Sequence, residues 1–523
     1  MHQITTPRTI PDVLALAVEH FGEAEALIDG GLRLSFRDLE AQADEAARAL
    51  MASGVQAGDR VAIWAQNSAA WEIAALGAYR AGAVVVTINT RFKGAEAAHV
   101  LATAEVRLLF TVNGFLDTDY VAVLEAAGRP ACVEEIVVLH GDATGGATRW
   151  TSFLERASGV EPAASAARAS AVQPADMSDI LFTSGTTGKP KGAMLGHEAS
   201  VRAYTSWSDV VGLQAGDRYL IVNPFFHAFG LKAGILACLL KGATILPHPV
   251  FDVPSVMQRV DEEQITMLPG PPAIYQTILD HPDLSNYDLS TLRLAVTGAA
   301  TVPVEMIRRM REELTFKTIV TGYGLTESTG IATMCRHDDP IELIASTAGR
   351  AIPDTEVLVV DEHGTEVPAG EPGEVVIRGY HVMRGYYNDP DATAGTIDAD
   401  GWLHTGDVGV MDRGGNLRIT DRTKDMIITG GFNAYPAEIE GMIMRHPAVS
   451  QVAVVGVPDH RMGEVAKAFV VLRPDAEWDE AAFLAWCKAE MANFKVPRSV
   501  EVLDALPLNA SAKVLKYELR ARQ

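Results

Sequence analysis

A glycine- and hydroxyl-rich loop directly after a short apolar segment constrains the fold most. Residues 180–182 (Ile-Leu-Phe) predict a buried strand. In the loop that follows, glycines let backbone N–H groups approach an anion, while hydroxyls and lysines add hydrogen bonds and positive charge. Because Pro190 follows Lys189, the loop is not the P-loop of common triphosphatases, which needs Ser or Thr there. We therefore predict a phosphate-binding loop rather than a plain polar surface loop, with candidate ligands Thr183, Ser184, Gly185, Thr186, Thr187, Gly188 and Lys189.

The chain of 523 residues is too long for one core, so several domains are expected. Its net charge of −23 argues against a nucleic-acid partner, which needs a basic face. The four cysteines lie far apart and form no metal or redox motif, which favours a reducing cytoplasm, and Cys238 and Cys487 are expected to be buried free thiols. No apolar run is long enough to span a bilayer, and residues 1–12 show no signal peptide.

Strand and helix patterns alternate over most of the chain, which predicts α/β lobes with parallel sheets. Ser35 is expected to cap a helix, and the Ala/Ser-rich residues 162–174 are expected to connect two lobes. Short strands and turns from about residue 355 predict a small β-barrel-like unit, and a different α+β pattern follows. We predict an N-terminal domain at 1–423, made of lobes at 1–174 and 175–340 and a β-barrel-like subdomain at 341–423, then a C-terminal domain at 424–523.

The loop resembles the phosphate loop of the AMP-forming acyl-CoA synthetases, which belong to the adenylate-forming superfamily with luciferases and peptide-synthetase adenylation domains. Residues 298–300 and 321–327, which read Gly-Ala-Ala and Thr-Gly-Tyr-Gly-Leu-Thr-Glu, agree with this resemblance. The resemblance implies that the C-terminal domain is a mobile lid, and that an aromatic ring and small residues enclose adenine. A carboxylate is a hard ligand that suits Mg²⁺. The resemblance assigns nucleotide binding to Gly298, Ala299, Ala300, Tyr323 and Thr326, and the metal to Glu327.

Further runs toward the C-terminus resemble the ribose, hinge and CoA segments of the same enzymes. Residues 507–514 resemble the catalytic-lysine loop, in which the lysine contacts the carboxylate and α-phosphate oxygens. These enzymes usually have glycine where this chain has Ala512. The resemblance assigns ribose binding to Asp407 and Arg422, the hinge to Lys424, CoA binding to Gly430, Gly431 and Phe432, nucleotide binding and catalysis to Lys513, and further catalytic roles to Thr326, Glu327 and His227.

Residues 223–230, Asn-Pro-Phe-Phe-His-Ala-Phe-Gly, resemble the entrance to the acyl pocket. His227 matches a gating residue there, and a hydrogen-bonded core histidine is the alternative. The many small residues suggest room for a bulky apolar acid. The predicted pocket lining comprises His227, Phe229, Gly230, Gly298, Gly322 and Gly324.

Several runs, including 179–182, 223–227 and 268–272, resemble an actinobacterial branch of fatty-acid–CoA ligases. The known member of that branch activates the propionate side chain on the two remaining rings of a degraded steroid. The resemblance therefore implies a bulky alicyclic or steroid-derived propionate as substrate. A medium-chain fatty acid or an aryl acid is the alternative.

The implied reaction uses ATP, Mg²⁺ and coenzyme A to convert a carboxylic acid into acyl-AMP and then into a thioester. Fixed donors, a metal and a lysine stabilise the charges of the first step, so no protein nucleophile is needed. Two other classes remain open: a stand-alone adenylation enzyme that loads a carrier protein, and a catalytically silent nucleotide-binding protein. The expected partners are a small-molecule acid and CoA, and a homodimer is also left open.

Overall fold

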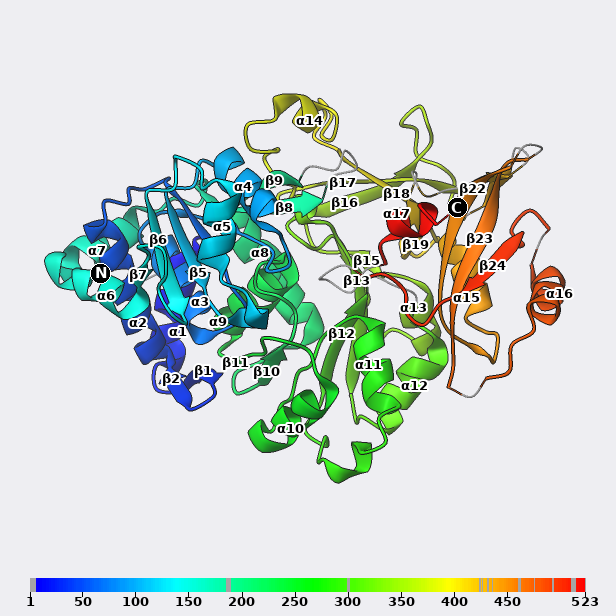
Figure 1. Ribbon diagram of the computed structural model, residues 1–523, viewed down its shortest axis with the longest axis horizontal. Coiled ribbons are helices and arrows are strands. Elements are labelled where there is room, and N and C mark those ends of the chain that lie inside the picture. The colour runs from blue at the N-terminus through cyan, green and yellow to red at the C-terminus, as the bar shows by residue number, and fades with distance from the viewer. Residues whose placement is uncertain are drawn as a thin grey trace.

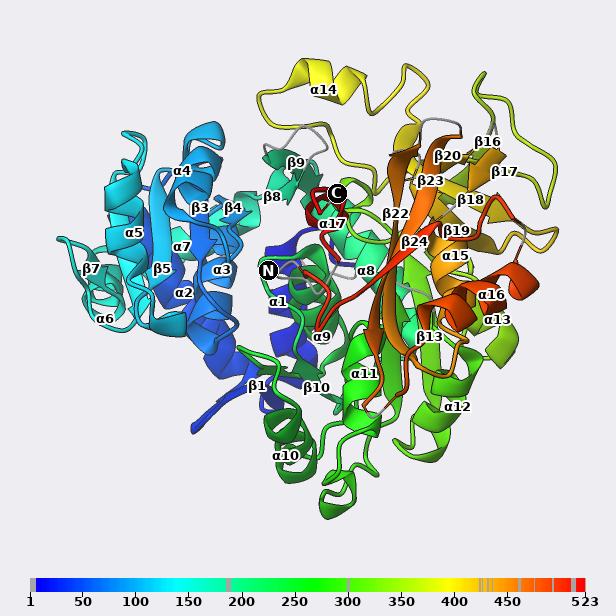
Figure 2. The ribbon, with the colours of Figure 1, turned by 45° about the vertical axis from the view of Figure 1, so that its right-hand side comes forward.

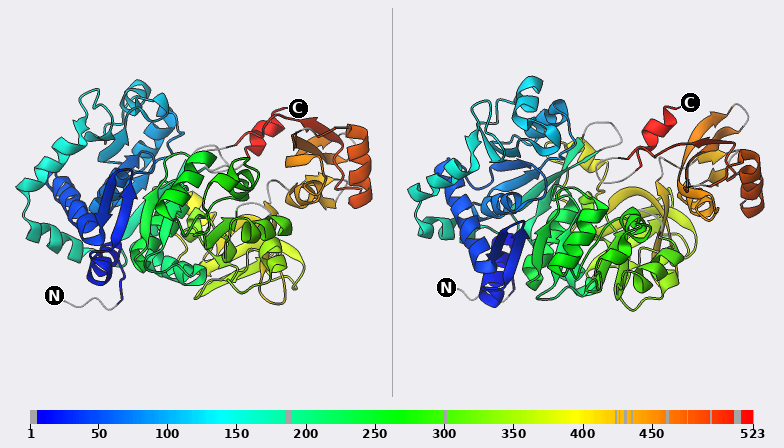
Figure 3. Two further views of the ribbon diagram at one scale, coloured as in Figure 1. Left: turned by 90° about the horizontal axis from the view of Figure 1, so that it is seen from below. Right: turned by 60° about the horizontal axis from the view of Figure 1, so that its bottom comes forward.

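The computed structural model describes residues 6–184, 190–298, 302–422, 425, 427–429, 432–434, 436–459, 462–474, 476–491, 493–508 and 514–522. Two α/β lobes and a third, β-rich unit pack together, and the C-terminal strands form a separate domain at one end (Figure 1). Views from below set this small domain apart from the rest of the molecule (Figure 3). The predicted plan of a large α/β domain followed by a small α+β domain is confirmed.

The first sheet carries the strand that leads into the predicted phosphate loop. Its strand order is β7-β6-β5-β3-β4-β8-β9, parallel as far as β8 and antiparallel at β9. Ser35 caps α2 as predicted, because its side chain accepts a hydrogen bond from the Asp38 backbone. The elements are α2 (Phe36–Ala52), β3 (Arg60–Trp64), α3 (Ala69–Arg80), β4 (Val84–Thr87), α4 (Gly94–Thr103), β5 (Leu108–Val112), α5 (Tyr120–Ala127), β6 (Glu135–His140), β7 (Thr148–Arg149), α6 (Trp150–Leu154), β8 (Met177–Ser184) and β9 (Pro190–Gly196).

Helix α7 (Pro162–Ala171) replaces the connector that we expected at residues 162–174. Pro162 starts the helix, where its missing N–H is not needed, and alanine has the highest helix propensity. Ser165 is buried and donates a 2.8 Å hydrogen bond to Asp44 of α2. The prediction was wrong because a helix of small residues packs closely without large apolar side chains.

The second sheet interleaves with the first along the chain. β1 and β2 come before the first-sheet strands but join β11 and β10, whereas β8 and β9 follow residue 174 yet belong to the first sheet. The sheets therefore do not divide at residue 174 as we expected. Met267 bridges β10 to β12, so β11, β10, Met267, β12 and β13 form one parallel series. The elements are α1 (Ile10–Phe21), β1 (Glu25–Asp29), β2 (Leu32–Ser35), α8 (His197–Val211), β10 (Arg218–Ile221), α9 (Ala237–Lys241), β11 (Thr244–Pro247), α10 (Val253–Glu263), α11 (Pro272–Leu279), β12 (Leu294–Gly298), α12 (Val304–Glu312), β13 (Thr318–Tyr323), β14 (Thr333–Met334), α13 (Ile341–Ser346) and β15 (Arg350–Ala351).

The β-barrel-like unit is a four-stranded antiparallel sheet in the order β16-β17-β18-β19. The C-terminal domain holds the sheet β21-β20-β23-β22, with β24 beside β23, and its helix α15 begins at Pro436 as predicted. The elements are β16 (Thr355–Val360), β17 (Pro372–Gly379), α14 (Pro390–Ala394), β18 (Leu403–Met411), β19 (Leu417–Arg422), β20 (Ile427–Thr429), β21 (Phe432–Ala434), α15 (Pro436–Ile443), β22 (Val449–Asp459), β23 (Gly463–Leu472), α16 (Glu480–Glu490), β24 (Ser499–Val502) and α17 (Lys516–Arg520).

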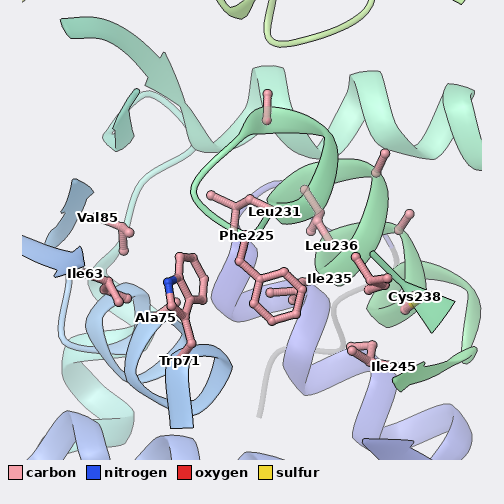
Figure 4. Packing of buried hydrophobic residues seen from close by; sticks show 14 of the residues in the cluster. Ile63, Trp71, Ala75, Val85, Phe225, Leu231, Ile235, Leu236, Cys238 and Ile245 are labelled. Carbon is pink, nitrogen blue, oxygen red and sulfur yellow. The ribbon is translucent and has the colours of Figure 1, made fainter. Parts of the chain in front are cut away.

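One hydrophobic core runs through both α/β lobes. Trp71 of α3 and Phe225, which follows β10, meet in this core with ring centroids 5.2 Å apart, and Ile235 lies beside Phe225 (Figure 4). Cys238 and Cys487 are buried free thiols, as predicted. Within the described part of the chain, every helix is too short or too polar to cross a bilayer.

A buried ion pair joins β8 to the segment that follows β10. The ammonium of Lys232, on the π-helix η3 (Phe229–Leu236), bonds to the carboxylate of Asp179 on β8, and both side chains are at most 1% exposed. The hydroxyls of Tyr79 and Ser178 also donate to Asp179. Burial lowers the pKa of Lys232, and the charge of Asp179 opposes that shift. The pair holds the phosphate-loop strand and η3 in one arrangement.

We expect Lys232→Met to lower the free energy of unfolding by about 3–5 kcal/mol, because it leaves a buried carboxylate without its counter-charge. The double variant Asp179→Asn/Lys232→Met should recover most of that loss, since the amide keeps partners for both hydroxyls without a charge. Urea unfolding of the three proteins measures the effect. Equal loss in the single and double variants would contradict it.

Candidate active site

Residues predicted to bind nucleotide converge at the carboxyl ends of parallel strands. β12 and β13 pair with Gly298 opposite Gly322, so Gly298 and Tyr323 end neighbouring strands. β8 brings Thr183 from the other sheet to the same place, where its hydroxyl donates a 3.2 Å hydrogen bond to Oε1 of Glu327. Open α/β sheets bind ligands at this edge. The meeting point of the two sheets is therefore the candidate active site.

Glu327 is oriented by contacts from three directions. It lies with Thr326 in the short 3₁₀ helix η5 (Thr326–Ser328), which follows β13. The hydroxyl of Tyr386 donates a 2.8 Å hydrogen bond to the same Oε1 that Thr183 contacts. The backbone N–H of Met383 donates to the Glu327 carbonyl at 2.7 Å. Two hydroxyls and one backbone contact thus fix where the carboxylate points.

This carboxylate fits a magnesium ion that arrives with a nucleotide. Within the described ranges, no group of three or more His, Cys, Asp or Glu side chains forms a ready-made metal site. Mg²⁺ commonly binds through one or two carboxylates plus substrate phosphates and waters. A single oriented carboxylate beside hydroxyls has the donor chemistry for that role.

Tyr386 is a site residue that the sequence did not reveal. Its segment pairs with β9, because Ala193 bridges Tyr386 and the N–H of Tyr387 donates to the Gly192 carbonyl at 2.8 Å. Nζ of Lys191 lies 5.1 Å from the centre of the Tyr386 ring. Burial and the charge of Glu327 raise the pKa of Tyr386, so its hydroxyl stays protonated and donates. The only hint in the sequence was an aromatic pair after a glycine.

The predicted adenine and ribose residues lie together. The hydroxyl of Tyr323 donates a 2.6 Å hydrogen bond to Oδ2 of Asp407, which is 4% exposed. The register of β18 and β19 places Asp407 opposite Arg422, whose backbone alone is described. The carboxylate of Asp407 therefore lies at the end of β13, next to the ring predicted to contact adenine. This position is compatible with its predicted contact to ribose.

His404 and Glu374 fix the start of strand β18, which carries Asp407, and the sequence did not single out either role. Nδ1 of His404 lies 2.9 Å from Oε2 of Glu374, and Nε2 lies 3.6 Å from Oδ2 of Asp398. Oε1 of Glu374 accepts a 3.1 Å hydrogen bond from the backbone N–H of Gly406. Burial opposes protonation of His404, but the hydrogen bonds and charges of Glu374 and Asp398 outweigh it and raise the pKa of His404.

The predicted acyl-pocket segment leads into the π-helix η3, a turn type that often occurs at functional sites. Nδ1 of His227 accepts a 3.1 Å hydrogen bond from the Phe229 backbone. Thr87 of β4 donates a 2.7 Å hydrogen bond to the Phe226 carbonyl. A Cβ at Gly230 would lie 2.2 Å from the Pro224 carbonyl oxygen, so only glycine allows this fold-back. The pocket-lining roles of these residues stay predictions.

Close backbone packing also favours glycine at Gly322 and Gly324. A Cβ at Gly324 would lie 2.4 Å from the Cα of Ile331, and one at Gly322 would lie 3.1 Å from the Thr333 carbonyl oxygen.

Several predicted site residues lie outside the described part of the chain and stay predictions. These are Gly185, Thr186, Thr187, Gly188, Lys189, Ala299, Ala300, Lys424, Gly430, Gly431 and Lys513, together with the side chains of Ser184, Arg422 and Phe432.

Two interlocked α/β sheets thus share an edge that carries an oriented carboxylate, and a separate C-terminal domain follows them. Residues 14–387 match the family model described as "AMP-binding enzyme", and residues 438–513 match "AMP-binding enzyme C-terminal domain". The chain therefore belongs to the AMP-binding enzyme family.

Close relatives agree with this class. The chain is 49% identical over 518 residues to a Rhodococcus jostii (strain RHA1) protein named 3-[(3aS,4S,7aS)-7a-methyl-1,5-dioxo-octahydro-1H-inden-4-yl]propanoyl:CoA ligase, covering 98% of each chain. A Mycobacterium tuberculosis protein of the same name is 48% identical over 513 residues, again with 98% of each chain covered. The crystal structure of anthranilate CoA ligase AuaEII with anthranoyl-AMP matches with a TM-score of 0.89 at 28% identity, covering 100% of this chain and 99% of that one. The prediction of an acid–thiol ligase that uses ATP and CoA is confirmed.

Because its folded-state pKa is raised, protonated His404 stabilises the fold below its unfolded pKa of about 6.5, and this contribution is lost as pH rises through the folded-state pKa. We expect the stability difference between wild type and His404→Gln to be largest near pH 5.5 and to shrink by about pH 8.5. Urea unfolding at both pH values measures it. His363→Gln, at an exposed histidine, is the control, and a difference that does not change with pH would contradict the expectation.

Proposed function

We propose that this enzyme joins CoA to a propanoate arm on a two-ring diketone nucleus, through an acyl-adenylate. The observation that carries the ligase chemistry is the meeting of Thr183, Glu327 and the Tyr323–Asp407 pair at one sheet edge. The substrate proposal is supported by two relatives of 48–49% identity that carry this name over 98% of their length. Relatives named medium-chain acyl-CoA ligases are 32–33% identical, which makes a fatty acid the second candidate.

In the proposed first step, a carboxylate oxygen of the acid attacks the α-phosphorus of ATP. The bond from that phosphorus to the bridging oxygen breaks, and pyrophosphate leaves with the bonding electrons. Tyr386 and Thr183 hold Glu327 where it would bind Mg²⁺, which supplies charge neutralisation for the phosphates when bound. Thr326 and Lys513 are proposed to contact the α-phosphate oxygens. Positioning and fixed charge lower the barrier of this step, and no protein nucleophile takes part.

In the proposed second step, the CoA thiolate attacks the acyl carbonyl carbon. The bond from that carbon to the phosphate oxygen breaks, and AMP leaves. Gly430, Gly431 and Phe432 are proposed to line the path of the thiol arm, and Lys424 is the proposed hinge for the C-terminal domain. His227 is the proposed gate between acid and thiol. One hinged domain serves both half-reactions if it presents different faces to the site.

Acid-dependent exchange of labelled pyrophosphate into ATP, followed by CoA-dependent AMP release, tests the proposal. We expect kcat/KM for the two-ring diketone propanoate to exceed that for octanoate and benzoate by at least about 10-fold, since pocket complementarity typically discriminates on that scale. Higher activity with octanoate would favour the second candidate. Exchange without CoA-dependent product would instead favour a carrier-loading enzyme, and no exchange with any acid would reject adenylation.

Tyr386→Phe should raise the free Mg²⁺ concentration for half-maximal exchange by about 10-fold, because loss of a hydrogen bond that orients a metal ligand commonly costs 10–100-fold. The KM for the acid should stay unchanged. Tyr387→Phe is a matched control, since that hydroxyl contacts exposed Glu105 instead. An unchanged Mg²⁺ requirement in Tyr386→Phe, or the same shift in both variants, would count against the role of Tyr386.

A further inference from the structure

Buried polar atoms without partners gather beyond the carboxyl ends of β10 and β11. They include Oδ1 of Asn223, both ring nitrogens of His248, and Nε and Nη2 of Arg259, none of which has a hydrogen-bond partner among the described residues. His248 is 4% exposed, and the charge of Arg259 acts on it from α10, which lies beside β10 (Figures 1 and 2). Unsatisfied buried polar atoms are costly, and the Arg259 nitrogens and one His248 nitrogen are donors, so the cluster points to a missing acceptor.

Asn67, in the loop before α3, fixes the backbone around these side chains. Its Nδ2 donates to the carbonyls of Ile221, Asn223 and His248 at 3.1, 2.9 and 3.3 Å, and its Oδ1 accepts from the Phe225 N–H at 2.7 Å. Asn67 is 6% exposed. One amide thus holds the backbone that follows two neighbouring strands, at Asn223 and His248, in register.

The strand series places this cluster at a definite distance from the nucleotide end of the site. β10 is two strand positions and β11 three from β12, through Met267. Strands lie about 4.8 Å apart, so the cluster stands roughly 10–14 Å along the edge from Gly298. A three-carbon arm on a two-ring nucleus spans about 10 Å, given C–C bonds of about 1.5 Å. An acid bound with its carboxylate near Gly298 would therefore bring its far ring to Asn223 and His248.

The chemistry of the cluster suits an uncharged oxygen acceptor. Burial, with the nearby charge of Arg259, lowers the pKa of His248 to about 4 against a weaker opposing effect of the Val250 backbone, so the ring is neutral near pH 7 and carries one N–H. Arg259 adds guanidinium donors through Nε and Nη2. A ring carbonyl offers two lone pairs and no charge, so it satisfies such donors without burying an ion. A saturated hydrocarbon ring would leave them unpaired.

We propose that His248 and Arg259, beside Asn223, form a recess in which they hydrogen-bond a ring carbonyl of the acid at the end far from its carboxylate. The proposal rests on the function proposed above and adds the residues that select a keto acid. It assigns His248 the role of a specificity-determining donor, held in place by Asn67.

The test compares the two-ring diketone propanoate with the matched acid whose ring carbonyls are reduced to methylene, using pyrophosphate exchange. Wild type should prefer the keto acid by about 10–100-fold in kcat/KM, the usual cost of stranding buried donors. His248→Phe and Arg259→Met should each bring that ratio close to one by losing activity on the keto acid, whereas His248→Asn keeps a donor and most of the preference. His381→Phe is the matched control, because His381 is also buried and has a pKa lowered to about 4.

Three outcomes would contradict the proposed recess. They are equal use of both acids by wild type, an unchanged ratio in both His248→Phe and Arg259→Met, and an equal loss on both acids, which would indicate a structural role. If neither two-ring acid supports exchange while octanoate does, the proposed substrate itself fails, and the recess falls with it. That result is distinct, because it appears in wild type before any variant is compared.

Discussion

The ion pair between Asp179 and Lys232 joins the two halves of the active site at their base. Asp179 precedes the phosphate loop by a few residues on β8, and Lys232 follows the predicted acid segment on η3. Charges that are buried this deeply are stable only while their partners stay in place. The ion pair therefore specifies one spacing between β8 and η3. In an adenylating enzyme, that spacing influences the distance between the carboxylate of the acid and the α-phosphate of ATP.

The first lobe reinforces this arrangement through backbone contacts. Asn67 and Thr87 bond to main-chain groups between Ile221 and His248, while Trp71 packs on Phe225 (Figure 4). Because these contacts go to backbone atoms, they position the acid segment without depending on which side chains line it. The backbone of the acid segment can therefore stay in place when the side chains around it change.

Toward the nucleotide, segments from distant parts of the chain orient the functional carboxylates. Tyr386 contacts Glu327, and Glu374 with His404 supports the part of strand β18 before Asp407. Neither Tyr386 nor His404 needs to touch the substrate to matter. Each restricts a carboxylate to one direction, and fixed direction is what makes preorganised charge effective.

The sequence by itself determined the chemical parts of this protein. The strand before the predicted phosphate loop, the cap at Ser35 and the helix start at Pro436 follow from local patterns, and the structure confirms these three. The order of the predicted nucleotide motifs also follows from local patterns. Even there, the Ala/Ser-rich stretch became helix α7, because its packing against Asp44 is not visible in composition.

Only the tertiary structure decided which strands share a sheet and which side chains meet. It interleaves β1 and β2 with β10 and β11, and it brings Tyr386 to Glu327 across 59 positions and Asn67 to Asn223 across 156. Such pairs depend on strand register and packing over the whole chain, which one sequence does not display. The local pattern names the groups that handle phosphate and acid, whereas the long-range contacts set their directions and distances.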